Sequence, residues 1–218
     1  MVYTVIYLGV GLLFSIVLPA TSITAEKEAR SWPLLLVTTL NENEILYGKF
    51  VGTVRRCLPG WSFLLGHVTL FGLATLIHPL AIPQIVILVV WTVTFLSGTG
   101  LYFGSVCRHT TMAVVLNFAL AAFIWAILPL FILIFLDALN FSDDLGEAYM
   151  DTNPFIHALV IMDATAGERD EPDYDWPGMG DVEWPGSTAW MLICGGAYVS
   201  LGLLFAWRAK HRLRRNIF

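Results

Sequence analysis

Long uninterrupted runs of apolar residues dominate the pattern along this chain. Five of them approach or exceed the roughly 20 residues that an α-helix needs to cross a bilayer core of about 30 Å. The runs are apolar on every side and far longer than a strand. The pattern predicts an all-α, polytopic helical membrane protein, a single transmembrane domain with spans at about residues 2–20, 58–77, 82–106, 112–136 and 188–207.

The segment between the first two runs, residues 21–57, is polar and has internal structure. Strong helix formers fill residues 24–32, and Pro33 then interrupts that helix. Residues 34–40 are too apolar to lie free in water. Asn41 and Glu44 have the spacing of a capping box, which predicts that a second helix begins there.

The polar stretch at residues 137–187 contains one short apolar helix, predicted from Asn153 to Ile161 and too short to cross a membrane. Residues 168–186 are acidic, aromatic and rich in Pro and Gly, which predicts an irregular surface loop. Inside the third run, small residues recur at a spacing that lets helices approach closely. Close packing within the bundle and a dimer seam both fit that face, which is formed by Gly98, Gly100 and Gly104.

Composition and charge exclude an ordinary soluble domain and orient the chain. Hydrophobic residues make up 57% and charged residues only 13%, against about 25% charged in soluble domains. Eleven of the twelve Lys and Arg residues lie in residues 21–57, at Arg108 and in the basic tail 208–218, whereas thirteen of the seventeen acidic residues lie in residues 137–187. By the positive-inside rule, we expect residues 21–57 and the C-terminus in the cytoplasm and the N-terminus outside, in a cell (inner) membrane.

Two motifs in residues 21–57 resemble those of ABC-2 type transporter permeases. They are E-x-E-x-x-[ST]-x-x-x-L-L, which begins at Glu26, and E-I-L-x-G-K, which ends at Lys49. Gly100 to Gly104 and the Asn153-Pro154-Phe155 start are also similar to that family. Permeases of this type usually have six spans, so the resemblance suggests that the first of them is missing here.

The resemblance implies the membrane-spanning subunit of an ATP-driven exporter. Two such subunits, identical or different, would pair in the lipid, and a separate ABC ATPase would dock on residues 21–57 as the cytoplasmic coupling loop. The residues expected to couple to the ATPase are Glu26, Glu28, Arg30, Leu35, Leu36 and Lys49. The alternative for the charged ones is a solvated extension of the first span.

Polar side chains at membrane depth are the other candidates. Such groups usually face the bundle interior, where they either hold helices together or line a pathway. Both interpretations stay open for His67 and Asn117, which are the candidates for a translocation path.

The sequence offers little support for nucleotide hydrolysis, enzyme catalysis or metal binding by this chain. Gly48-Lys49 lacks the remainder of a phosphate-binding loop, so ATP hydrolysis is expected on another chain. We expect no enzyme activity, cofactor, metal site or nucleic-acid partner, although the acidic residues 170–183 could bind a cation weakly. The alternative function is a membrane anchor or assembly factor whose acidic outer loop is a binding module.

Overall fold

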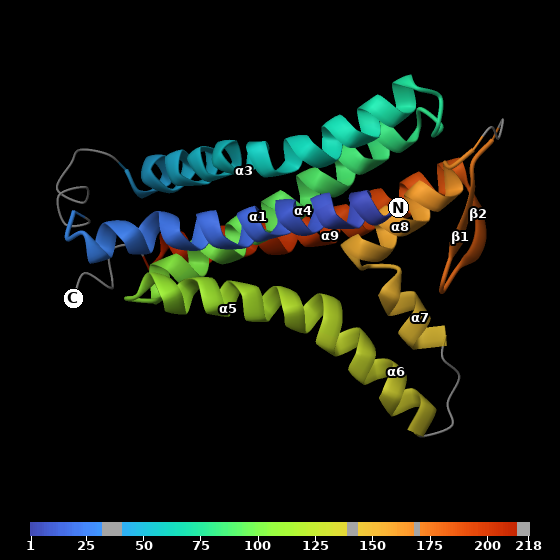
Figure 1. Ribbon diagram of the computed structural model, residues 1–218. Coiled ribbons are helices and arrows are strands. Elements are labelled where there is room, and N and C mark those ends of the chain that lie inside the picture. Colours follow the sequence, from blue (N-terminus) through green and yellow to red (C-terminus); the bar gives the residue numbers. More distant parts are fainter. Residues whose placement is uncertain (32–40, 139–143, 168–170, 213–218) are drawn as a thin grey trace. The chain divides into compact units, whose positions relative to one another are not determined.

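A computed structural model describes residues 1–31, 41–138, 144–167 and 171–212, and these are mostly helical (Figure 1). The predicted coupling residues Leu35 and Leu36 lie outside the described residues. The elements, all but η1 labelled in Figure 1, are α1 (Val2–Glu28), α3 (Glu42–Leu73), α4 (Ala81–Val106), α5 (Thr110–Ala122), the π-helical turn η1 (Phe123–Ile127), α6 (Leu128–Ala138), α7 (Asp144–Met150), α8 (Pro154–Ala164), β1 (Asp173–Trp176), β2 (Gly180–Glu183) and α9 (Trp184–Lys210).

Four helical segments are long and apolar enough to cross a membrane: Val2–Glu28, Ala81–Val106, Thr110–Ala138 and Trp184–Lys210. The prediction of a helical protein with several membrane spans is confirmed to that extent. The predicted span at residues 58–77 overlaps the second half of α3, which ends at Leu73 and is not one of these four. That fifth span, and with it the orientation, stays a prediction.

Helix α3 joins the helix predicted to begin near Asn41 and most of the predicted span at residues 58–77 into one continuous element. It runs 32 residues from Glu42 through Pro59 to Leu73, about 48 Å at 1.5 Å per residue. Proline removes one intrahelical donor, but helices near a bilayer tolerate the loss where neighbouring groups compensate. The predicted capping box is present at its start, because the Asn41 amide donates to Glu44 Oε2 at 2.8 Å.

The acidic stretch after α8 is a β-hairpin, so the predicted irregular loop is wrong. Strands β1 and β2 pair antiparallel, with Trp176 opposite Gly180, whose positive φ of 68° suits the turn. The side chains of Tyr174 and Trp176 are fully buried while those of Asp173 and Asp175 are exposed. Burial of alternate aromatic residues therefore gives this polar sequence a regular strand.

The chain forms two compact units, each described by itself. One contains residues 1–9, 61–90 and 121–196, and the other contains residues 10–60, 91–120 and 197–218. In the second, glycines let backbones approach: Gly98 of α4 lies against Gly202 of α9, whereas Gly100 and Gly104 lie against Ala20 of α1. The small-residue face thus packs against helices of the same chain.

In the first unit, the Asn153 side chain links the π-helical turn η1 to the start of α8. Pro129 of α6 has no N–H to donate to the carbonyl four residues earlier, that of Trp125 in η1. Asn153 Nδ2 donates to this oxygen at 2.6 Å, and the Tyr149 hydroxyl donates to the Ile124 carbonyl at 3.0 Å. Asn153 Oδ1 also accepts from the Phe155 amide at 2.9 Å, which caps α8, a helix that confirms the predicted one.

Substitution of Asn153 should therefore reveal two separate roles. We expect Asn153→Ala to destabilise the fold by about 2–4 kcal/mol, because it removes a helix cap and leaves the buried Trp125 carbonyl without this donor. Asn153→Asp keeps the cap but places an anionic oxygen against that carbonyl, so it should not restore stability. Thermal midpoints of the purified protein in detergent measure both. Thr152→Ala, which loses only a local bond to the Tyr149 carbonyl, is the control, and a wild-type midpoint for Asn153→Asp would contradict the donor role.

Candidate functional site

The last turn of α1 places three consecutive charged residues against three other helices. Glu26 contacts α3, Lys27 contacts the end of α4, and Glu28 contacts the start of α5. We call these residues the Glu26–Glu28 triplet. Successive residues of a helix point about 100° apart, since 3.6 residues complete a turn. Three neighbours in sequence can therefore reach three different helices.

Lys27 closes the C-terminal end of α4. Its ammonium donates to the carbonyl oxygens of Gly104 at 2.9 Å, Ser105 at 2.7 Å and Cys107 at 3.0 Å. The last carbonyls of a helix have no intrahelical donor and carry the negative end of the helix dipole. All three N–H groups of the lysine are thus used by one helix end.

Glu28 closes the N-terminal end of α5. Its two carboxylate oxygens accept from the Thr110 amide at 2.7 Å and from the Thr110 hydroxyl at 2.8 Å. A carboxylate is favoured at this end because unpaired amides and the positive end of the dipole meet there. Lys27 and Glu28 together hold both sides of the three-residue joint between α4 and α5.

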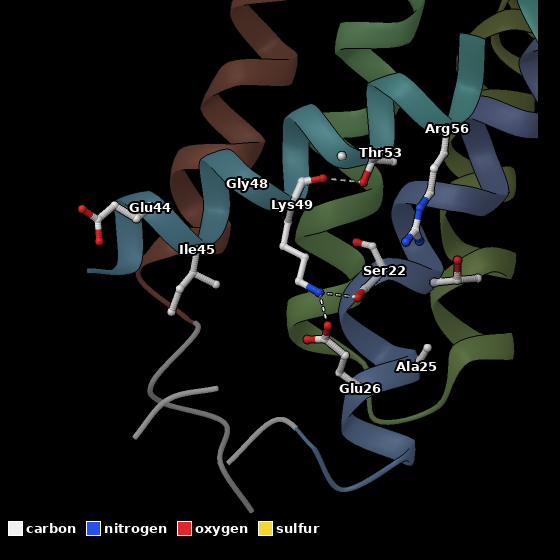
Figure 2. A pocket seen from close by; sticks show the side chains of 11 residues that line it. Ser22, Ala25, Glu26, Glu44, Ile45, Gly48, Lys49, Thr53 and Arg56 are labelled. Carbon is white, nitrogen blue, oxygen red and sulfur yellow. Dashed lines mark hydrogen bonds and ion pairs between the residues drawn. The ribbon is translucent and has the colours of Figure 1, made fainter. Parts of the chain in front are cut away.

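Glu26 pairs with Lys49 of α3, as Figure 2 shows. Lys49 Nζ also donates to the Ser22 carbonyl at 3.3 Å, so the lysine reaches both a side chain and the backbone of α1. The pair is partly buried, with side-chain exposures of 21% for Lys49 and 32% for Glu26. Beside it lies a pocket of about 470 Å³ between α1 and the first half of α3 (Figure 2).

The structure thus brings together three of the predicted coupling residues, Glu26, Glu28 and Lys49, and all three make contacts inside the chain. Arg30 is exposed just beyond α1, with a φ of 55°. The Arg30 amide donates to the Lys27 carbonyl at 3.1 Å, whereas no hydrogen-bond or ion-pair partner of its guanidinium lies in the described part of the chain. Sequence reasoning missed Lys27 and Thr110, because the partners of Lys27 are backbone carbonyls about 80 residues away, which leave no side-chain signature.

The two predicted pathway residues have different surroundings. Asn117 is fully buried: its Oδ1 accepts from the Thr99 hydroxyl at 2.8 Å and its Nδ2 donates to the Ile16 carbonyl at 2.9 Å. These bonds tie α5 to α4 and α1, which favours the structural interpretation of Asn117. His67 of α3 lies among aromatic rings, with centroid distances of 5.4 Å to Tyr7 and 4.4 Å to Phe71.

The acidic hairpin does not gather ligands for a metal. Within the described ranges, no group of three or more His, Cys, Asp or Glu residues is placed to hold one. Asp151 is buried and accepts from the Gly178 amide at 3.1 Å through Oδ2, which anchors the hairpin turn. Burial raises the pKa of this carboxyl, and the bond to Gly178 opposes the shift.

A scan against protein-family models found no match, and a search of curated proteins found none either.

Proposed function

We propose that this chain is the membrane-spanning subunit of an ATP-driven exporter of the ABC-2 type, which works with a separate ATPase and a second membrane subunit. The observation that carries the proposal is the Glu26–Glu28 triplet. A protein bound to the segment that follows α1 would act on one helix end that is tied to α3, α4 and α5. No other described segment in the basic regions contacts so many helices through charged groups.

The triplet supplies a physical route for coupling. ATP can shift a transporter between conformations only through contacts that differ between them. Movement of the end of α1 would pull on the α4–α5 joint through Lys27 and Glu28, and on α3 through the Glu26–Lys49 pair. These links are short and involve charged groups, so they transmit displacement better than a flexible loop. His67 remains a candidate for the translocation path in this proposal.

Arg30 is the informative position for testing ATPase docking. Charge reversal at Glu26 or Glu28 would break contacts inside the chain as well as a contact with the ATPase. Arg30→Glu leaves those internal contacts intact. Because arginine is enriched among the few residues that dominate interface energy, with losses of about 2 kcal/mol or more, the variant should retain at least tenfold less ATPase.

The measurement is co-purification after co-expression with an ABC ATPase of the same genome, normalised to the amount of the chain in the membrane. Arg55→Glu is the control, since Arg55 is also exposed but lies within α3 rather than beside the proposed docking segment. Equal recovery of ATPase with both variants would rule out docking at Arg30. Failure of every ABC ATPase to co-purify with the wild-type chain would overturn the proposed function.

A second candidate, a membrane anchor with an outer binding module, is favoured by one feature of the hairpin. Asp175 lies opposite Asp181, and Asp173 lies opposite Glu183, with all four side chains exposed. Like charges directly across a strand pair are destabilising, which suggests selection for a basic partner. The same purification separates the two candidates. An anchor would retain its partner when the hairpin carboxylates are intact and would lose it in the Asp175→Asn, Asp181→Asn double variant. No ATPase would co-purify with either protein.

A further inference from the structure

The pocket between α1 and α3 is lined largely by polar and charged residues. Its lining comes from the last turns of α1 and the first half of α3 (Figure 2). The helix α1 is one of the four that are long and apolar enough to cross a membrane. The lining residues used below are Thr21, Ser22, Glu26, Gly52, Thr53 and Arg56.

Three of the residues that line the pocket carry hydroxyl groups. Each uses its single hydrogen within its own helix: Thr21 donates to the Leu18 carbonyl at 3.0 Å, Ser22 to the Pro19 carbonyl at 2.9 Å and Thr53 to the Lys49 carbonyl at 2.6 Å. A hydroxyl that has donated its hydrogen offers only lone pairs to a ligand. The wall is therefore suited to a group that donates hydrogen bonds.

Glu26 adds a stronger acceptor to the same wall. Its Oε1 pairs with Lys49, while its Oε2 is buried and has no hydrogen-bond partner in the described part of the chain. A buried carboxylate oxygen without a donor is costly. A ligand that brings a hydroxyl or ammonium group would remove that cost.

Arg56 supplies the opposite chemistry at the edge of the pocket. Its side chain extends from α3 toward α1 in Figure 2. It is exposed, and its guanidinium has no partner among the residues that the structure describes. Guanidinium groups bind phosphate oxygens in pairs. One end of the pocket thus favours an anion and the other favours hydrogen-bond donors.

We propose that this pocket binds the headgroup of a membrane phospholipid, with the phosphate at Arg56 and a donor-bearing end at Glu26 Oε2 and the three hydroxyls. Glycerol hydroxyls or an ethanolammonium group meet this requirement. Choline does not, because its quaternary nitrogen has no N–H. The site thus distinguishes headgroups by their hydrogen-bond donors, and this inference does not depend on an ATPase partner.

The test uses the purified full chain in nanodiscs of phosphatidylcholine that contain phosphatidylglycerol or phosphatidylethanolamine as the minor lipid. Lipid retained after transfer to detergent is counted by native mass spectrometry. We expect the wild-type chain to retain either minor lipid in preference to phosphatidylcholine. A parallel arm adds soluble glycerol 3-phosphate, which should compete only if the headgroup alone is sufficient.

Two pairs of variants locate the site. Gly52→Leu should fill the pocket and abolish the preference, and because a Cβ at Gly52 meets nothing within 4 Å and leucine favours helix over glycine, this variant should fold. Gly66→Leu, on the same helix with the same open surroundings, should keep the preference. Arg56→Gln should weaken retention about tenfold, as expected for loss of a charge-assisted bond, whereas Arg55→Gln should not.

Equal retention of phosphatidylcholine by the wild-type chain would overturn the proposal, as would an unchanged preference in Gly52→Leu. Equal losses in the Arg55 and Arg56 variants would show general attraction of basic residues to anionic lipid and would also overturn it. If Gly52→Leu instead blocked ATPase binding and left lipid retention unchanged, the pocket would belong to a protein partner.

Discussion

Replacing Lys27 by methionine should lower the stability of the chain more than removing any exposed charge nearby. Methionine keeps the length and apolar stem of lysine but donates no hydrogen bonds. Three carbonyl oxygens, those of Gly104, Ser105 and Cys107, would lose their common donor. A polar group left unsatisfied costs about 1–3 kcal/mol when buried, and because Lys27 itself is only partly buried we expect about 3 kcal/mol in total.

The thermal midpoint of the purified protein in detergent measures this effect, and a fall of about 6–12 °C corresponds to it for a domain of this size. Arg30→Met is the matched control, because it removes the same charge from an exposed side chain three residues later. A midpoint for Lys27→Met within a degree or two of that control would contradict the capping role. If the proposed function holds, Lys27→Met should also uncouple ATP hydrolysis from transport while ATPase binding persists.

Substitution of Gly98 by alanine should disrupt the contact between α4 and α9. A Cβ at Gly98 would fall well inside van der Waals distance of the Gly202 carbonyl, which belongs to rigid helix backbone. From the other side, a Cβ at Gly202 would lie 2.7 Å from the Cα of Phe95. Relief requires separation of two helices, so the cost should be at or above the upper end of the about 1–3 kcal/mol typical of overpacking.

Gly66→Ala is the control for this substitution, since a Cβ at Gly66 meets nothing within 4 Å. Alanine is favoured over glycine in a helix by about 0.8–1 kcal/mol, so Gly66→Ala should keep or raise the thermal midpoint. A Gly98→Ala protein as stable as Gly66→Ala would show that the two helices do not approach through these glycines.

Local patterns in the sequence were sufficient for several elements. The capping box at Asn41 and Glu44 predicted where α3 begins, and the Asn153-Pro154 pair predicted the start of α8. Both signals depend on groups within four residues of each other, so they act before any tertiary contact forms. The limits of the second predicted span were harder to predict, because α3 joins a charged half to an apolar half without a break.

The candidate site was only partly predictable. The motif located Glu26, Glu28 and Lys49 and suggested that they contact a partner protein. In the structure, each of them makes a hydrogen bond or ion pair within the chain. Lys27 carried no special signal, since its role depends on the carbonyls at the end of α4. For Asn117, burial and hydrogen bonds to two helices favour the structural interpretation, and no sequence pattern could reveal those contacts.

The sequence by itself determined that this chain is mostly helical, with several segments long and apolar enough to cross a membrane, because apolar runs of that length need no tertiary context to be recognised. It also determined the separation of basic from acidic segments. Only the tertiary structure decided that the acidic stretch folds into a hairpin, that the Glu26–Glu28 triplet holds three helices, and that a pocket of hydrogen-bond acceptors lies beside Arg56. Those features depend on contacts between residues far apart in the chain. The energy of such contacts depends on burial and distance, which a linear pattern does not contain.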